Sequence, residues 1–187
     1  AGVEQRSPNR DLALYILAQI HHARQEFGSA AEYYTQVENL FADAKETLLA
    51  LHEKTIALPE VTNARPGEPV ELTLTHRNVA RAELLVYPVD LMTLYLREKT
   101  LAHVAGIELA GISPTLRKTI ELGADSQLRA REAKVALELK EPGAYLVIAR
   151  GDEQHATGLV LVSNLDLEVR EDSEAGRLRI QVLDHSG

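Results

Sequence analysis

The chain contains no cysteine and no tryptophan, only one methionine, and few aromatic residues, which make up 4% of its 187 residues. The lack of cysteine excludes disulfides, thiol catalysis and zinc–thiolate sites. No apolar run approaches the length that is needed to span a bilayer, so we expect no membrane insertion. These absences remove several classes of enzyme and membrane protein from consideration.

Basic residues are also in the minority. There are 20 Lys and Arg against 28 Asp and Glu, a net charge of −8 that is spread along the whole chain. Because no basic stripe is present to neutralise phosphates, nucleic-acid binding is not expected. The apolar fraction of 45% and charged fraction of 26% are typical of a folded protein with one medium domain or two small ones.

The first third of the sequence has a helical apolar period. Leu12, Ile16, Ile20, Ala23 and Phe27 lie on one predicted stripe, with Asn9 or Asp11 as the cap of the first helix. Ser29 and Glu32 have the spacing of a capping box, which predicts a second helix over 30–40. A third helix is predicted over 43–52 and ends before Pro59.

The first two of these segments resemble the helix-turn-helix unit of a tetratricopeptide repeat. The positions that match the pattern are Leu14, Leu17, Ala18, His21, Ala30 and Tyr34. Leu14 stands in place of the pattern's tryptophan, Ala18 in place of its glycine, and Ala42 in place of its proline. Since such repeats are stable in arrays, a single unit leads us to expect a fragment of a longer protein. A plain helical hairpin packed on the next domain is the alternative.

After Pro59 the apolar period becomes two, which is typical of half-buried strands. Val70, Leu72 and Leu74 alternate with polar residues, and so do Val135 and Leu137. Further strands are predicted over 61–65, 82–89, 145–149, 156–162, 165–169 and 177–183, and one short helix over 90–99. Turn residues at about ten-residue spacing favour an antiparallel sandwich. The pattern leaves the fold of 100–116 open.

The sequence around Tyr145 resembles the tyrosine corner of immunoglobulin-like sandwiches. Tyr145 stands two residues before Val147, the position at which antibody domains carry a cysteine. We expect the Tyr145 hydroxyl to bond to the nearby backbone.

Two longer phrases are similar to a macroglobulin-type domain of bacterial alpha-2-macroglobulin-like proteins. They are ARPGEPVELTLTHRNVARAELLVYPVDLMTLYLRE and LKEPGAYLVIARGDEQHATGLVLVSNLDLEV, with the Arg77-Asn78 corner and the Tyr87 to Asp90 segment inside the first. The resemblance covers about 61–184. It implies a scaffold domain of a protein that traps peptidases with a bait segment and often a thioester, neither of which this chain contains. It also implies a periplasmic or secreted location.

Arg150, Gly151 and Asp152 form the tripeptide of cell-adhesion signals between two predicted strands. Glycine and aspartate are also the residues that a hairpin turn favours. We therefore interpret the tripeptide as a bend, with an adhesive role as the alternative.

No residue pattern points to catalysis or to a metal. His21 and His22 are adjacent on a helix and point in different directions, and His52, His76, His103, His155 and His185 are scattered. The acidic run of Asp166, Glu168, Glu171, Asp172 and Glu174 lacks the glycine spacing of a calcium loop. Ser113 and Ser163 belong to no nucleophile motif. We expect no enzyme activity, no cofactor, and no catalytic, cofactor-binding or metal-site residues.

The sequence thus predicts an α+β chain in two parts. Residues 1–58 form a helical hairpin of repeat type, and residues 59–187 form an antiparallel immunoglobulin-like β-sandwich with one inserted short helix. The predicted function is that of a structural and interaction domain of a larger protein. Its expected partners are other domains of the same polypeptide, and peptidases met by the whole molecule. A ligand-binding or adhesive module that uses the helical groove or the hairpin loops is the alternative.

Overall fold

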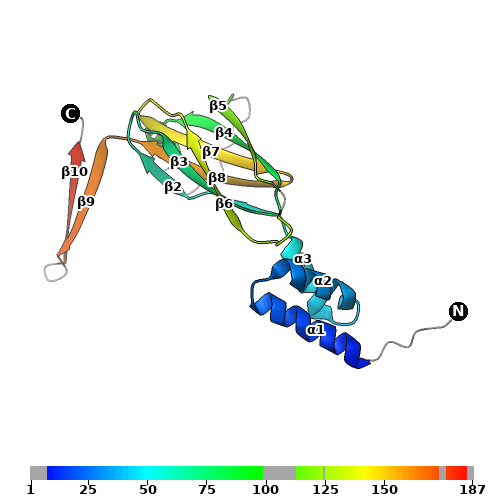
Figure 1. The fold of residues 1–187 in the computed structure, drawn as a ribbon. Helices are drawn as coiled ribbons and strands as arrows, with labels where there is room; N and C mark the ends of the chain where they lie inside the picture. Colours follow the sequence, from blue (N-terminus) through cyan, green and yellow to red (C-terminus); the bar gives the residue numbers. More distant parts are fainter. Residues whose placement is uncertain (1–7, 99–112, 124, 173–175, 185–187) are drawn as a thin grey trace.

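The computed structural model describes residues 8–98, 113–123, 125–172 and 176–184. The described elements run in the order α1 (Pro8–Ala23), α2 (Phe27–Val37), α3 (Ala42–His52), β1 (Thr55–Ala57), β2 (Val61–Ala64), β3 (Val70–Arg77), β4 (Arg81–Val89), α4 (Leu91–Glu98), β5 (Leu116–Glu121), β6 (Arg131–Leu137), β7 (Gly143–Gly151), β8 (Gln154–Val162), β9 (Leu165–Asp172) and β10 (Arg177–Asp184). Helices α1–α3 lie at one end of the molecule, the β9–β10 hairpin at the other, and the remaining strands between them (Figure 1). This is the α+β class that the sequence predicts.

The three N-terminal helices enclose a small core of their own. Its buried members are Ala18, Ala30, Ala31, Tyr34, Val37, Ala44 and Leu51. Tyr15 of α1 contributes a stacked contact with Phe41, with ring centroids 4.3 Å apart. Ala18 of α1 and Ala30 and Ala31 of α2 are among these buried residues, and small side chains at a contact let helices approach closely.

The predicted apolar stripe of α1 does not face this core. Leu12, Ile16 and Ile20 are 40–48% exposed, while Leu14, Tyr15 and Ala18 on the neighbouring face pack inward. Phe27, the last member of that stripe, begins α2 instead of ending α1. The helix has two apolar faces, and periodicity could not tell which one is buried.

The prediction of a capping box at Ser29 is also wrong. The second helix begins at Phe27, three residues before the predicted start, with Glu26 at the N-cap position and no side-chain cap. Ser29 therefore lies inside the helix. The third helix is confirmed, because α3 spans Ala42–His52. No helix among the described residues is long and apolar enough to cross a membrane.

Two sheets form the central part, which we call the two-sheet domain. One sheet has the order β1-β3-β6 and the other the order β2-β8-β7-β4-β5. All of their pairings are antiparallel except that of β2 with β8, which is parallel, so the second sheet is mixed. Strand β1 precedes Pro59, the residue at which the sequence analysis placed the start of this domain.

One core joins the two sheets. Val70, Leu72 and Leu74 of β3 pack with Leu84 and Val86 of β4, and β6, β7 and β8 add further buried side chains. These residues occupy alternate positions of their strands, because period-two side chains share one face. Packing of the two inner faces supports the predicted β-sandwich.

Strands β9 and β10 do not join either sheet. They pair with each other in a separate two-stranded sheet, in register from Leu165 with Asp184 to Asp172 with Arg177. The hairpin projects from the far end of the two-sheet domain (Figure 1). The prediction that 165–169 and 177–183 belong to the sandwich is therefore wrong, although both segments are strands.

The inserted helix is confirmed as α4. Asp90 caps it, since its carboxylate accepts hydrogen bonds from the Thr93 amide at 3.0 Å and the Thr93 hydroxyl at 2.7 Å. Both bonds lower the pKa of the Asp90 carboxyl, and the bond from the Thr93 backbone amide has the larger effect. Most of the stretch 100–116, whose fold the sequence left open, lies outside the described residues, and Leu116 begins β5.

Candidate functional site: the joint between helices and sheets

The C-terminus of α3 is held by the turn between β3 and β4. Asn78 donates from Nδ2 to the carbonyls of Leu51 at 2.8 Å and Glu53 at 2.9 Å. Arg77 donates from Nη2 to the carbonyl of Ala50 at 3.1 Å and from Nε to that of Glu53 at 3.3 Å. The last carbonyls of a helix lack partners within the helix and carry partial negative charge, so an amide and a cation stabilise them.

The backbone of Asn78 makes this contact possible. Its φ is +57°, in the left-handed region that asparagine tolerates better than most residues. The Arg77-Asn78 corner, which the sequence singled out as part of a resemblance, thus lies at the joint between the two parts of the chain.

A second contact lies between the β5–β6 loop and the α1–α2 turn. Arg129 donates to the carbonyl of Gln25 from Nε at 3.1 Å and from Nη2 at 2.8 Å. Leu128 packs against the core of the helices. At Gly28 a Cβ atom would stand 2.6 Å from the carbonyl oxygen of Ser126, so glycine is needed for this close approach.

The loop that makes this contact is held in shape by its own bonds. The Gln127 amide donates to Oδ1 of Asp125 at 2.9 Å. Arg131 donates from Nη2 to the carbonyls of Leu122 at 3.0 Å and Gly123 at 2.8 Å. The loop therefore presents Arg129 and Leu128 to the helices on a defined backbone.

The Arg150-Gly151-Asp152 tripeptide belongs to the same region. Lys54, which follows α3, forms an ion pair with Asp152 at 2.9 Å. Gly151 is buried at the end of β7, where a Cβ would stand 2.7 Å from Cγ1 of Val79 and 2.8 Å from Cδ1 of Ile56. Glycine is thus required by packing.

The turn itself is made by Asp152 and Glu153, and it is Asp152 that has the positive φ, +51°. The bend is confirmed, but the glycine has a different reason from the turn geometry that the sequence suggested. With Asp152 paired and Gly151 buried, the tripeptide is not presented as a free loop.

Three contacts therefore tie the helices to the two-sheet domain: the α3 cap, the β5–β6 loop and the Lys54–Asp152 pair. The domain contributes its β3–β4 turn, its β5–β6 loop and its β7–β8 hairpin to these contacts. Hydrogen bonds to charged donors hold geometry well, while an exposed ion pair adds little stability. The arrangement fixes the orientation of the helices relative to the two-sheet domain.

Several of the described histidines make local packing or hydrogen-bond contacts. His21 lies 2.6 Å from the Glu26 carboxylate and stacks on Tyr33, and His22 packs edge-on against Phe27. His52 contacts the Leu48 carbonyl at 2.9 Å, His155 is exposed, and His103 and His185 lie outside the described residues.

His76 is the buried histidine of the two-sheet domain. It is 3% exposed, and its Nδ1 has no protein partner. The pKa of His76 is lowered mainly by burial and to a smaller extent by the charge of Arg131. The neutral form is therefore favoured in the folded state.

Within the described residues, no three His, Asp or Glu side chains are grouped as metal ligands. Of the acidic run, Asp166 pairs with Arg65 at 3.6 Å and Glu168 with Arg170 at 2.7 Å, while Glu174 lies outside the described residues. The Oγ of Ser163 accepts a hydrogen bond from the Leu165 amide at 3.0 Å.

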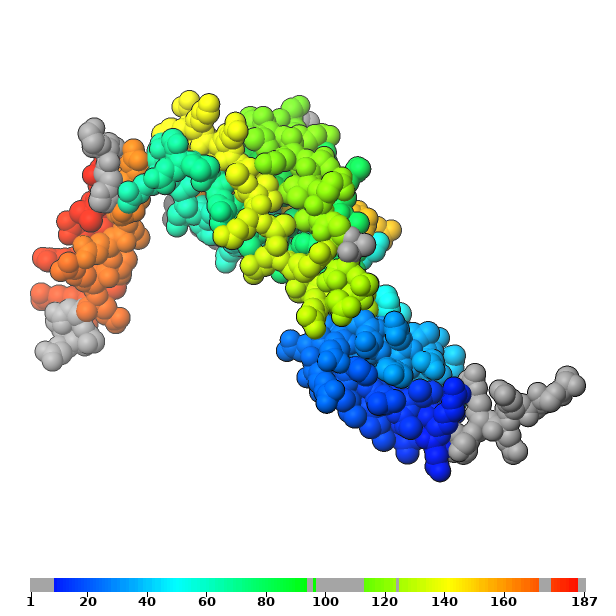
Figure 2. Space-filling view, viewed as in Figure 1, coloured from blue at the N-terminus to red at the C-terminus, as the bar shows by residue number. Residues whose placement is uncertain are grey.

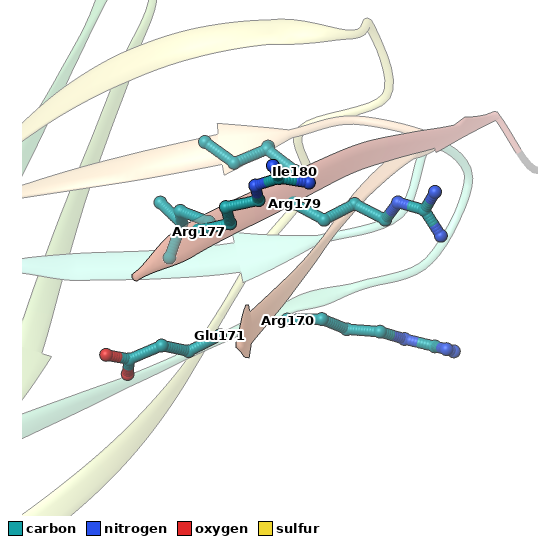
Figure 3. Close-up of a pocket in the computed structure, with 6 residues that line it drawn as sticks. Arg170, Glu171, Arg177, Arg179 and Ile180 are labelled. Atoms are coloured by element: carbon teal, nitrogen blue, oxygen red, sulfur yellow. The ribbon is translucent and has the colours of Figure 1, made fainter. Parts of the chain in front are cut away.

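Three hollows formed by described residues, on the hairpin, beside its base and at the β7–β8 turn, are open to solvent. One, of about 680 Å³, lies on the β9–β10 hairpin and is lined by Arg170, Glu171, Arg177, Leu178, Arg179 and Ile180 (Figure 3). In Figure 3 Glu171 extends to the side opposite Arg170, and the labelled charged side chains do not converge on one point. A binding site for a small molecule needs convergent polar groups in an enclosed space, and this hollow has neither.

The tyrosine corner is confirmed in its geometry. The Tyr145 hydroxyl donates to the carbonyl of Glu141 at 2.8 Å, across the turn that leads into β7. This bond locks the start of a central strand, as it does in immunoglobulin-like domains.

Among the described residues, two surfaces carry four or more exposed apolar side chains each. The first, which we call the α1 stripe, consists of Leu12, Ile16, Leu17 and Ile20. The second, which we call the hairpin face, consists of Leu165, Leu167 and Val169 on β9 and Leu178, Ile180 and Val182 on β10. They belong to opposite ends of an elongated molecule (Figure 2). Exposed apolar patches of this kind mark interaction sites.

Comparison with known proteins gives a likeness in fold. No family model and no curated protein matches the chain. Among solved structures, the chain is similar to native alpha-2-macroglobulin from Escherichia coli, in a crystal structure spanning domains MG0-NIE-MG1. The identity is 14%, the TM-score 0.51, and the likeness covers 71% of this chain and 46% of that one.

At that identity the likeness concerns the fold alone. It supports a macroglobulin-like β-domain, as the sequence resemblance implies, and it does not extend to a tetratricopeptide unit. The chain spans less than half of the neighbour's length. Two other solved structures are less similar. One is a CARDB domain from Pyrococcus furiosus in complex with di-metal ions, with 16% identity and a TM-score of 0.32, covering 59% of this chain and 92% of that one. The other is the sulfur carrier protein SoxY from Chlorobium limicola, with 10% identity and a TM-score of 0.26, covering 65% of this chain and 97% of that one.

The sequence analysis singled out the Arg77-Asn78 corner and the Arg150-Gly151-Asp152 tripeptide, but it did not predict that they contribute to the joint between the helices and the two-sheet domain. Arg129 and Lys54 lie in stretches without a motif, and their partners are backbone or distant residues. Gly28 carried a usable signal, because a glycine in the first turn of a helix weakens the helix unless something packs closely against it.

Proposed function

We propose that the chain is a non-catalytic structural and interaction domain of a large, alpha-2-macroglobulin-like protein that traps peptidases and is periplasmic or secreted. In this proposal the two-sheet domain is an immunoglobulin-like sandwich and the helices are a unit of repeat type. The observation that carries the proposal is the fold likeness to the Escherichia coli protein, at a TM-score of 0.51.

The joint supports this role. A scaffold must keep its parts in one orientation, and the contacts of Asn78 and Arg129 do so with charged or bidentate hydrogen bonds to backbone. The partners are other domains of the same polypeptide, for which the α1 stripe and the hairpin face are candidate contact surfaces.

The test uses the full-length protein that contains this chain. It is incubated with a broad-specificity peptidase, and activity is then measured on a small peptide and on a folded protein substrate. Trapping predicts that cleavage of the small peptide persists while cleavage of the protein substrate falls, because an enclosed peptidase still admits small molecules. The 187-residue chain alone, as a control, changes neither.

If the full-length protein leaves both activities unchanged, peptidase trapping is excluded. If the 187-residue chain itself hydrolyses either substrate, its non-catalytic assignment is wrong.

A further inference from the structure

The β9–β10 hairpin has two chemically different faces. The register pairs Leu167 with Val182 and Val169 with Ile180, so the hairpin face is continuous across both strands. Its six members are 51–64% exposed. The opposite face carries Glu168, Arg170, Arg179 and Gln181, among others. This alternation is that of a sheet with one side on a core and the other in water.

The two-sheet domain does not supply that core. The buried residues of its clusters include none of the hairpin residues. An ion pair of Asp166 with Arg65, at 3.6 Å, links the hairpin to the domain near the start of β9. The hairpin stands apart from the body in the space-filling view (Figure 2).

A two-stranded sheet of this kind is marginal in water on its own. Within the described residues, the outer edges of β9 and β10 pair with no further strand. Long, apolar strands with free edges are templates for pairing with other strands, and folded proteins cover them. Both the face and the edges therefore call for a partner that is itself rich in strands.

The path of the chain indicates which partner. Asp184, at the end of β10, is paired with Leu165 at the base of the hairpin. Beside that base lies an open cleft of about 780 Å³, lined by Asn63, Ala64, Arg65, Glu68, Leu161, Ser163, Leu165, Asp166 and Leu167. Polypeptide that follows β10 thus emerges next to the apolar residues that need cover. A tethered segment has an effective concentration in the millimolar range, which favours it over a separate molecule.

We propose that β9 and β10 are the first two strands of a second β-domain, and that the polypeptide following residue 187 completes it by covering the hairpin face and pairing with the free edges. This inference rests on the proposed function in one respect, namely that the chain is part of a larger protein. It adds that the chain divides at Ser163 and Asn164, between β8 and β9.

The test compares amide hydrogen exchange in two proteins: the 187-residue chain, and the same chain extended by roughly 120 residues, about one domain, of its natural continuation. We expect the amides of β9 and β10 to exchange at least about 100-fold more slowly in the extended protein, because their opening then requires unfolding of a domain. The amides of β3 and β7 serve as an internal reference, with equal rates in both proteins.

A matched pair of substitutions tests the face. Val182→Thr keeps shape and β-branching but places a hydroxyl on the hairpin face, while Gln181→Thr changes the neighbouring residue on the opposite face. In the extended protein, Val182→Thr should reduce the protection of β9 and β10 by about tenfold or more, and Gln181→Thr should leave it unchanged. Neither should alter the exchange of β3 and β7.

Equal, fast exchange of the hairpin in both proteins would overturn the inference, and so would protection that appears in the 187-residue chain as its concentration rises, which would identify a second copy as the partner. A natural frame that stops soon after residue 187 would overturn it as well. The trapping assay is independent: a protein that traps peptidase with an unprotected hairpin refutes this inference alone, and a protected hairpin without trapping refutes the peptidase-trapping function alone.

Discussion

Asn78 and Leu51 are 27 positions apart in sequence, and the side-chain amide of the first donates to the carbonyl of the second at 2.8 Å. The same nitrogen donates to Glu53 at 2.9 Å, so one side chain closes the end of α3 and anchors the β3–β4 turn to it. The helices and the two-sheet domain are therefore linked by specific bonds in addition to the short connecting chain.

Asn78→Asp should weaken this joint. The substitution removes both donors and places carboxylate oxygens against two carbonyl oxygens, which we expect to cost about 1–3 kcal/mol in the free energy of unfolding. Thermal and urea unfolding of the 187-residue chain would measure it.

Asn78→Gly is the matched control, because glycine accepts the φ of +57° and simply lacks the side chain. It should cost less than Asn78→Asp. Equal stability of the aspartate variant and the wild type would show that the bonds to α3 do not hold the joint.

Gly151→Ala should destabilise the two-sheet domain by about 1–3 kcal/mol, since its new methyl would collide with Val79 and Ile56. Gly67→Ala is a useful comparison, because Gly67 has a positive φ of +82° but no atom lies within 4 Å of the added carbon. Chemical denaturation of both variants separates steric from conformational cost.

The adhesive alternative makes a different prediction at the neighbouring position. If Arg150-Gly151-Asp152 bound a receptor, Asp152→Glu would abolish cell attachment to the immobilised chain. We expect no attachment above background with either protein, because Asp152 is paired with Lys54 and Gly151 is buried.

His76 should make stability depend on pH. Its folded-state pKa is lowered by burial and by Arg131, with smaller opposing effects of a backbone hydrogen bond at Val79 and of Asp125. The unfolded chain therefore binds the proton more readily. The stability that this histidine contributes is fully present above the unfolded pKa of about 6.5 and is lost as the pH falls below it toward the folded pKa.

His76→Gln removes the titrating group at similar size. Urea unfolding at pH 7.5 and 5.5 should show a smaller loss of stability on acidification in this variant than in the wild type. An identical loss in both proteins would mean that the histidine does not contribute to acid sensitivity.

Much of the two-sheet domain could be predicted from its sequence. Strands β3 and β6 bury alternate residues against one core, and a period of two in the sequence indicates this directly. The Tyr145 hydroxyl bond followed from a local pattern as well. Strand β5 was missed because LRKTIE lies at a sheet edge and is mostly polar, so it lacks the apolar alternation of its neighbours.

Other features depend on contacts that periodicity does not encode. In α1 both Leu12 and Leu14 belong to plausible apolar faces, and α2 decides between them. The alternation in β9 and β10 shows that they are strands but does not say which sheet they join. The joint is built largely from side chains bonded to distant backbone carbonyls, such as Arg129 to Gln25, and backbone carbonyls are present at every position.

The central claim is that this chain is a scaffold segment whose two apolar surfaces are covered in a larger protein. Hydroxyl-radical footprinting followed by mass spectrometry tests it at single side chains. Ile16 of the α1 stripe and Leu167 of the hairpin face should be oxidised readily in the 187-residue chain, where they are 45% and 64% exposed, and several-fold more slowly in the full-length protein. Leu72, 1% exposed, should stay unreactive in both and report an intact fold. Equal oxidation of Ile16 and Leu167 in the two proteins would contradict the account.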